Sequence, residues 1–169
     1  AAIEEVMTDA SWFSRTLIEK LANIMRYFVD EAPKHTIPLE TEIGFIKNYI
    51  DLEKTRMRYP LEISFKETLS SSDIQVPPML IIPLVENVFK HGIDKRKEDN
   101  FISIDIEEQN GRLQVTVRNR IAGNQLDEQS GSGLANLKNR LTLLFGHQYS
   151  LNSSPTSEHI YESVLSIPL

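Results

Sequence analysis

Residues 77–92 read Pro-Pro-Met-Leu-Ile-Ile-Pro-Leu-Val-Glu-Asn-Val-Phe-Lys-His-Gly, and this stretch decides the fold. It predicts an apolar helix that opens at Pro77-Pro78, because proline suits the first turn of a helix, and that runs to about His91. Pro83 predicts a kink or a later start, since proline removes a hydrogen bond inside a helix. Three apolar residues at four-residue spacing form the predicted buried side: Leu80, Leu84 and Val88.

The polar residues of this helix are typical of a site for a metal–phosphate group. Asn87, Lys90 and His91 stand at i, i+3 and i+4, so one face carries an amide oxygen, an ammonium and an imidazole. Magnesium keeps most of its waters and phosphate ligands, so one asparagine oxygen is enough, and lysine supplies a point charge to phosphate. Periodicity alone favours the plainer alternative, a solvated polar face.

A second cluster, Gly131-Ser132-Gly133-Leu134, precedes a predicted helix over residues 133–145, which carries four leucines on one side: Leu134, Leu137, Leu141 and Leu144. Glycine permits close approach of the backbone, and the N–H groups at a helix N-terminus can bind phosphate. The polar stretch before it, residues 121–132, predicts a mobile loop that would suit a lid over a ligand.

Outward from these clusters, the apolar periodicity predicts two helices, over residues 9–29 and 39–58, joined as a helical hairpin. Thr36 or Thr41 is the expected cap of the second helix. Alternation predicts strands over residues 61–65, 101–107, 113–117, 149–151 and 160–167. Asn110-Gly111 is the strongest hairpin signal. The order after the helical hairpin is β, α, β, β, α, β, β, a mixed α/β layer.

Composition excludes several classes of protein. The 169 residues are 40% hydrophobic and 25% charged, which is ordinary for a globular protein, and the absence of cysteine excludes disulfides and thiolate metal sites. The formal net charge of −6 argues against a nucleic-acid partner. The longest apolar stretch, residues 76–85, is about half of what a membrane-spanning helix needs. Because the chain does not begin with methionine, we expect a fragment or a processed form.

The two clusters together resemble the sensor histidine kinases of the LytS/YehU type. Residues 77–92 resemble the N-box of that family, residues 131–146 its second glycine box and following helix, and residues 42–65 the segment that links its dimerisation helices to the catalytic domain. The resemblance runs from about Leu17 to Leu169. It implies the Bergerat (GHKL) ATP-binding fold, a two-layer α/β sandwich shared with gyrase and MutL ATPases, here preceded by the helical hairpin. Residues 1–58 would be the C-terminal part of the dimerisation region, and residues 59–169 the ATP-binding catalytic domain.

The resemblance also implies the roles of individual residues. Asn87 would bind the magnesium that bridges the ATP phosphates, and Glu86 beside it would handle a proton or hold the site; these two are the candidate catalytic residues. The remaining ATP-binding candidates are Lys90 and His91 facing the phosphates, Gly131 and Gly133 in a lid-side turn, Leu134 and Asn136 behind that turn, and Asn119 near the base.

Three features depart from the family pattern. The first glycine box usually begins with an aspartate that accepts a hydrogen bond from the adenine amino group, and Asn119 stands in that position with no glycines after it. An asparagine carbonyl can accept the same bond without charge, so we expect weaker base recognition. The usual Gly-Thr before the last strand is replaced by Ile160-Tyr161. No histidine precedes His35, so the family's phosphoacceptor in an Asn-Pro-His-Phe motif is expected upstream of this chain, and His35 is expected to be an ordinary surface residue.

Three functional hypotheses remain open. The first is a kinase catalytic domain that passes the γ-phosphate of ATP to the upstream histidine, with a response regulator and a second copy as partners, on the cytoplasmic side of an inner-membrane sensor. The second is a degenerate nucleotide-binding module that signals without kinase activity, which Asn119 favours. The third is a hydrolase of the gyrase or MutL kind; it is disfavoured because Pro83 stands where those enzymes carry a catalytic glutamate.

Overall fold

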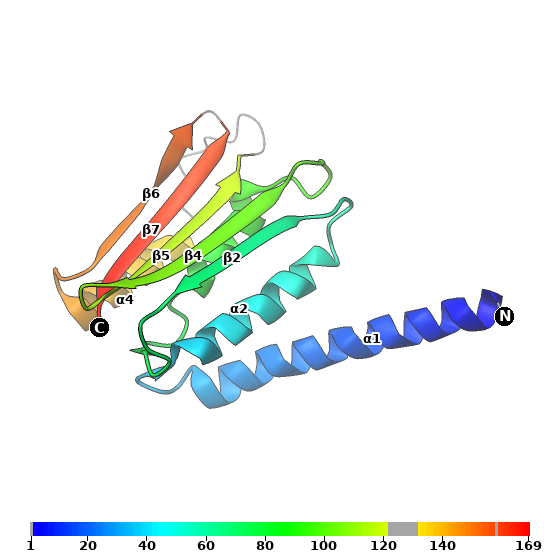
Figure 1. Cartoon of the computed structure of the whole chain (residues 1–169), viewed down its shortest axis with the longest axis horizontal. Coiled ribbons are helices and arrows are strands. Elements are labelled where there is room, and N and C mark those ends of the chain that lie inside the picture. Colours follow the sequence, from blue (N-terminus) through cyan, green and yellow to red (C-terminus); the bar gives the residue numbers. More distant parts are fainter. Residues whose placement is uncertain (1, 122–131, 158) are drawn as a thin grey trace.

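The computed structural model describes residues 2–121, 132–157 and 159–169 as a five-stranded sheet with helices packed on one face and a long N-terminal helix extending away (Figure 1). The helices are α1 (Ala2–Arg26), α2 (Leu39–Lys54), α3 (Ile82–Asn87) and α4 (Ser132–Phe145), with π-helical turns η1 (Tyr27–Glu31) and η2 (Val88–Gly92). The strands are β1 (Ile37–Pro38), β2 (Glu62–Thr68), β3 (Gln75–Val76), β4 (Phe101–Gln109), β5 (Arg112–Arg120), β6 (Ser150–Ser157) and β7 (Ile160–Pro168).

The main sheet has the strand order β2-β4-β5-β7-β6, in which only the β2–β4 pair is parallel. Alternate residues of each central strand point into the core, for example Ile102, Ile104 and Ile106 of β4. The β4–β5 hairpin turns at Asn110 and Gly111, whose φ angles of 54° and 70° are those of a type I′ turn. The hairpin predicted from Asn110-Gly111 is therefore confirmed.

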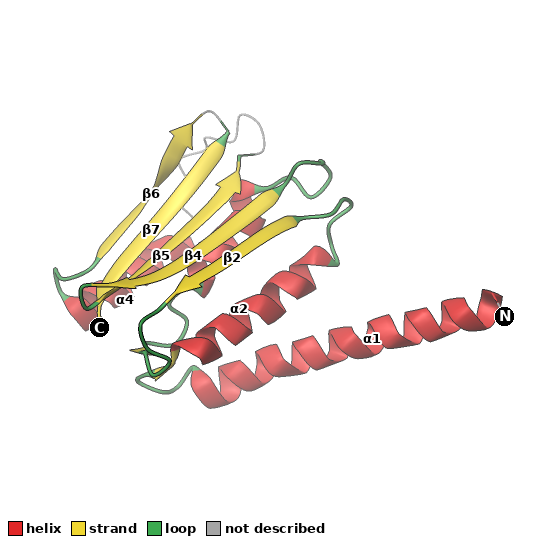
Figure 2. Ribbon diagram, viewed as in Figure 1, coloured by secondary structure: helices red, strands yellow, loops and turns green. Residues whose placement is uncertain are grey.

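The helical hairpin is formed by α1 and α2, which lie side by side at one end of the sheet (Figure 2). Helix α2 buries Ile43, Ile46 and Ile50 in the same hydrophobic core as the sheet residues. The fold class predicted from the sequence, an α/β sandwich preceded by a helical hairpin, is confirmed. The division of the chain at residue 58 stays a prediction; α2 lies before it and shares the core that lies after it.

The helix expected to open at Pro77 begins five residues later, at Ile82, so that part of the prediction was wrong. Residues Gln75 and Val76 pair instead with β1, and the chain then turns through Met79, whose φ is 57°. Pro83 lies in the first turn of α3, where its missing N–H costs nothing, which is the later start that the sequence allowed.

Two smaller expectations were also wrong. Neither threonine caps α2, which follows Pro38 without a side-chain cap; the Leu39 amide donates to the Ile74 carbonyl at 2.8 Å instead. Leu144 was expected on the same side of the last helix as three other leucines, and it is 50% exposed. The three others are buried: Leu134, Leu137 and Leu141.

At the far edge of the sheet, β6 is longer than the three residues predicted and is irregular. Its pairing with β7 shifts register between Pro155 and Ser157.

In the part of the chain that the structure describes, no helix is both long and apolar enough to cross a membrane.

Candidate functional site

The predicted N-box residues lie on α3 and η2, which are anchored by a buried apolar side. Leu84, Val85 and Val88 are at most 3% exposed and fix the helix against the core. Glu86 and Asn87 are half-buried, while Lys90 and His91 are exposed. The apolar spacing at Leu80, Leu84 and Val88 was therefore interpreted correctly, and it leaves the polar residues at the surface of the layer.

Glu86 and Lys90 form an ion pair. The Lys90 Nζ lies 2.9 Å from Glu86 Oε2, four residues earlier. Both side chains are more than a third exposed, so the pair contributes little to stability. The ion pair instead positions the Lys90 ammonium on the outer face of the helix that carries Asn87.

Asn119 lies beside the end of η2, which brings the predicted base-binding position against the predicted phosphate-binding helix. A Cβ built on Gly92 would lie only 2.4 Å from Asn119 Nδ2, so the contact depends on a glycine at that position. Asn119 is 1% exposed, and its Nδ2 donates to the Arg120 carbonyl at 2.9 Å. The two sequence motifs are thus joined by a direct contact that the sequence did not predict.

The second glycine box is divided between described and undescribed residues. The lid was predicted over residues 121–132, and residues 122–131 of it, Gly131 included, lie outside the described residues. Gly133 belongs to the first turn of α4 and is exposed, rather than forming a turn before the helix. Leu134 is 4% exposed and anchors α4 in the core, whereas Asn136 faces outward.

The end of α2 flanks the N-box helix with residues that the sequence did not single out. The rings of Tyr49 and Phe89 meet edge to face with centroids 5.9 Å apart. Burial raises the pKa of Tyr49, and the carboxylates of Glu53 and Glu86 raise it further. Glu53 itself is 6% exposed and bridges Arg56 and Lys95, at 3.1 and 2.6 Å.

A buried polar cluster lies where α3 begins; we call it the Met79 hub, and it consists of Tyr27, Glu42, Met79, Ile81 and Arg140. Glu42 is 0% exposed. Its Oε1 accepts the Ile81 amide at 3.0 Å, and its Oε2 accepts the Met79 amide at 3.0 Å and the Tyr27 hydroxyl. Arg140 of α4 donates to the carbonyls of Met79, at 3.2 Å, and Pro78.

Little in the sequence points to this hub. Glu42 lies in a helix whose other charged residues are mostly exposed. A sequence pattern therefore assigns Glu42 to the exposed face as well. The one available signal was its position directly before Ile43, on the side of the helix that carries the apolar residues.

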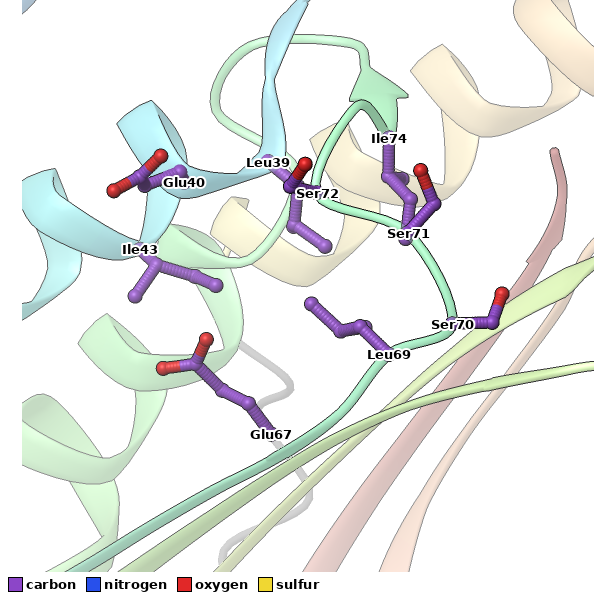
Figure 3. Close-up of a pocket in the computed structure, with 9 residues that line it drawn as sticks. All are labelled: Leu39, Glu40, Ile43, Glu67, Leu69, Ser70, Ser71, Ser72 and Ile74. Carbon is purple, nitrogen blue, oxygen red and sulfur yellow. The ribbon is translucent and has the colours of Figure 1, made fainter.

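A separate cavity of about 420 Å³ opens between the start of α2 and the end of β2 (Figure 3). Leu39, Ile43 and Leu69 form its apolar wall, and Ser70 to Ser72 with Glu40 and Glu67 form its polar wall. None of the predicted site residues lines it. Among the residues described, no group of three or more histidine or acidic side chains could hold a metal ion.

The comparisons with known proteins agree with the sequence resemblance. Residues 2–61 match the family model described as histidine kinase. The sensor protein LytS of Staphylococcus epidermidis is 31% identical over 152 residues, covering 82% of this chain and 26% of that protein. The chain belongs to the histidine kinase family. The sensor histidine kinase/phosphatase LytS of Staphylococcus aureus is 30% identical over 158 residues, covering 85% of this chain and 27% of that protein.

The chain spans about a quarter of the length of the curated relatives it matches. Among solved structures, the catalytic domain of histidine kinase ThkA superposes with a TM-score of 0.54 at 16% identity, over 79% of this chain and 93% of that one. ThkA in complex with the response regulator protein TrrA superposes with a TM-score of 0.52 at 16% identity, over 89% of this chain and 48% of that one. These likenesses show that the chain has the fold of histidine kinase catalytic domains.

Proposed function

We propose that this chain binds magnesium-ATP along α3, η2 and the start of α4, and that it passes the γ-phosphate to a histidine in a segment upstream of Ala1. The observation that carries the proposal is the contact between Gly92 and Asn119, because it joins the N-box helix to the strand end where the family binds the base. A bound ATP would then have its base near Asn119 and its phosphates along the N-box helix.

The residues present suit a magnesium–phosphate group. The Asn87 side chain has no hydrogen-bond partner among the described residues, so its amide oxygen is available as a hard ligand. A bound magnesium would neutralise charge on the phosphates. Lys90 and His91 stand one turn further along the helix and would contact the phosphates from the protein side. Glu86 holds Lys90 by their ion pair, which supports a positioning role for this acid.

A second copy of the chain is the proposed partner of α1. The outer face of α1 and of η1 after it carries exposed apolar residues at steps of three, four and three, which are between 46% and 68% exposed: Ile18, Leu21, Met25 and Phe28. Ile24 and Tyr27 on the other side are buried. A stripe with this spacing is typical of a helix that packs in a bundle, so we propose that a dimer covers it, together with the upstream phosphoacceptor helix.

A response regulator is the proposed recipient of the phosphate, because ThkA was solved with one. We propose the cytoplasmic side of an inner-membrane sensor protein as the location of the chain, which the proposed use of ATP supports. A nucleic-acid partner is not proposed, since the net charge is −6.

Asn119 favours one alternative, a nucleotide-binding signalling module without kinase activity. Its amide nitrogen is already bonded to Arg120, and an asparagine lacks the charge of the family's aspartate. Hydrolysis of the gyrase or MutL kind is not proposed, because Pro83 lies at the start of α3 where a catalytic glutamate would be needed.

Isothermal calorimetry of the 169-residue chain with ATP, in magnesium and in EDTA, tests the proposal. We expect binding in the micromolar to millimolar range that weakens when magnesium is removed. If no nucleotide binds in either buffer, the proposed function is wrong. If ATP binds but a longer chain that includes the upstream segment acquires no acid-labile label, the signalling module replaces the kinase.

A further inference from the structure

The Met79 hub joins three elements that the proposed function treats separately. Tyr27 is the first residue of η1, directly after α1, while Glu42 comes from α2 and Arg140 from α4. All three converge on the backbone between Pro78 and Ile81. That backbone leads directly into α3, the helix that carries Asn87. The same five residues therefore link the dimerisation helix, the N-box helix and the helix of the second glycine box.

The hub determines where α3 begins. Met79 has a left-handed φ of 57°, which a residue with a side chain adopts only when its surroundings hold it. Its amide lies 2.7 Å from the Tyr27 hydroxyl oxygen and 3.0 Å from Glu42 Oε2, and its carbonyl accepts from Arg140. Ile81, held by Glu42 Oε1, is the N-cap residue of α3. Glu42 thus supplies the acceptor that no local side chain provides for this helix start.

Hydrogen-bond donors surround the Glu42 carboxyl group, and Arg140 belongs to the same cluster. A carboxylate that is 0% exposed is retained in a protein when all of its oxygens are bonded, and each oxygen here accepts from at least one donor. Burial, and then the Glu42 carboxylate, raise the pKa of Tyr27 well above its ordinary value, so the phenol keeps its proton and donates it to Glu42. Loss of Glu42 would leave the buried Ile81 amide without its acceptor, and loss of Tyr27 would remove one of the two donors to Glu42 Oε2.

We propose that Glu42 is a positioning residue of the nucleotide site, which sets the start of α3 through the backbone of Met79 and Ile81 and makes that position depend on Tyr27, directly after α1. The proposal rests on the proposed function, since it assigns the consequence to ATP affinity. A displacement of α1 that removed Tyr27 from Glu42 would take away one of the two donors to Glu42 Oε2 and loosen the helix that carries Asn87. Arg140 extends the same dependence to α4.

Two variants change one polar group of the hub each and leave the packing in place. Glu42→Gln keeps the shape of the side chain, but its amide nitrogen cannot accept a backbone N–H. Tyr27→Phe removes only the hydroxyl and keeps the ring stacked on Phe45, with centroids 4.0 Å apart. Ile46→Val is the matched control, because Ile46 is equally buried on α2 and touches the core rather than the hub. Thermal unfolding identifies the conditions at which all four proteins are folded.

Two measurements on the 169-residue chain test the proposal. Calorimetry with magnesium-ATP should show affinity lowered about tenfold in Glu42→Gln and about threefold in Tyr27→Phe, with Ile46→Val unchanged. Hydrogen–deuterium exchange without nucleotide should show faster exchange across residues 79–92 in both hub variants and only scattered changes in Ile46→Val. If Glu42→Gln does not fold, Tyr27→Phe carries both measurements.

The two measurements separate the failures. If the wild-type chain binds no ATP, the proposed function is wrong, and exchange over residues 79–92 still decides whether Glu42 positions α3. If Tyr27→Phe and Glu42→Gln bind ATP as tightly as Ile46→Val and exchange as the wild type does, Glu42 is structural only and the positioning role is overturned. Affinity lowered equally in all three variants also overturns it, since general destabilisation then accounts for the loss.

Discussion

Gly92 sets how closely η2 approaches the end of β5. Its replacement by alanine would place a Cβ 2.4 Å from Asn119 Nδ2, and the Asn119 side chain is 1% exposed, so it has no free space into which to move. We expect Gly92→Ala to lower the free energy of unfolding by about 1–3 kcal/mol, the usual cost of overpacking. Chemical denaturation measures the change.

A double variant isolates the cause. Asn119→Ala removes the three atoms nearest to the new Cβ, so Gly92→Ala with Asn119→Ala should be less destabilised than the sum of the two single variants. Gly44→Ala is the control of opposite sign: nothing lies within 4 Å of its Cβ, and alanine suits the interior of α2 better than glycine by about 0.5–1 kcal/mol. Strict additivity at positions 92 and 119 would contradict the contact.

Asn87 carries the second prediction at this scale. Replacing Asn87 with alanine removes the candidate magnesium ligand, and replacing it with aspartate adds a charge beside the phosphates. Either change should weaken magnesium-ATP binding by about 1–3 kcal/mol, the range for losing a buried polar partner. Asn152→Ala, an exposed asparagine on the edge strand β6, is the matched control. Calorimetry that finds equal affinity for wild type and Asn87→Ala removes Asn87 from the site.

Sequence patterns located some of these residues and not others. Asn87 and Lys90 were identifiable because they share a helix with an apolar side and stand in a motif. Glu42 and Tyr27 were not, because their role comes from contacts 15 to 52 residues apart in the chain, and no local pattern distinguishes a buried acid from an exposed one. The Gly92–Asn119 contact was hidden for the same reason.

At the scale of elements, regular alternation was the most reliable guide. The strands β4, β5 and β7 and the hairpin turn between β4 and β5 follow directly from it. The start of α3 was misplaced because β1 and β3 have two residues each, too few to show any period, and because their pairing brings together Ile37 and Val76 from distant parts of the chain. The two π-helical turns also leave no trace in the sequence pattern.

A truncation series tests where the folded catalytic unit begins. Helix α2 contributes Ile43, Ile46 and Ile50 to the core of the sheet, and β1 pairs with β3. We therefore expect residues 37–169 to fold cooperatively, with ATP affinity lowered as in Tyr27→Phe, and residues 59–169 to lose cooperative unfolding, since several large core side chains would be missing. Thermal unfolding and NMR dispersion measure both. A cooperative, ATP-binding fragment 59–169 would support the division at residue 58.

For the whole molecule, the prediction concerns phosphate transfer. Phosphoryl transfer needs an acceptor held in line with the γ-phosphate, so we expect no self-labelling of the 169-residue chain at its four histidines: His35, His91, His147 and His159. A separate polypeptide that carries the upstream histidine helix should be labelled slowly, because untethered partners meet at a lower effective concentration. Radiolabelled ATP followed by acid treatment distinguishes these outcomes, and acid-labile label on the chain alone would show that one of its own histidines is the acceptor.

The irregular edge strand β6 has a consequence for how copies of this molecule can crowd together. An exposed strand edge is a template on which another chain can add its own strand, and such addition propagates into aggregates. Here the edge consists of Ser150, Leu151, Asn152, Ser153, Ser154, Pro155, Thr156 and Ser157, with one residue that has no N–H to offer and a shift of register beside it. Polar side chains, a missing donor and a bent edge make each copy a poor template for the next. Two copies of the proposed dimer can therefore lie close together without pairing their sheets at this edge.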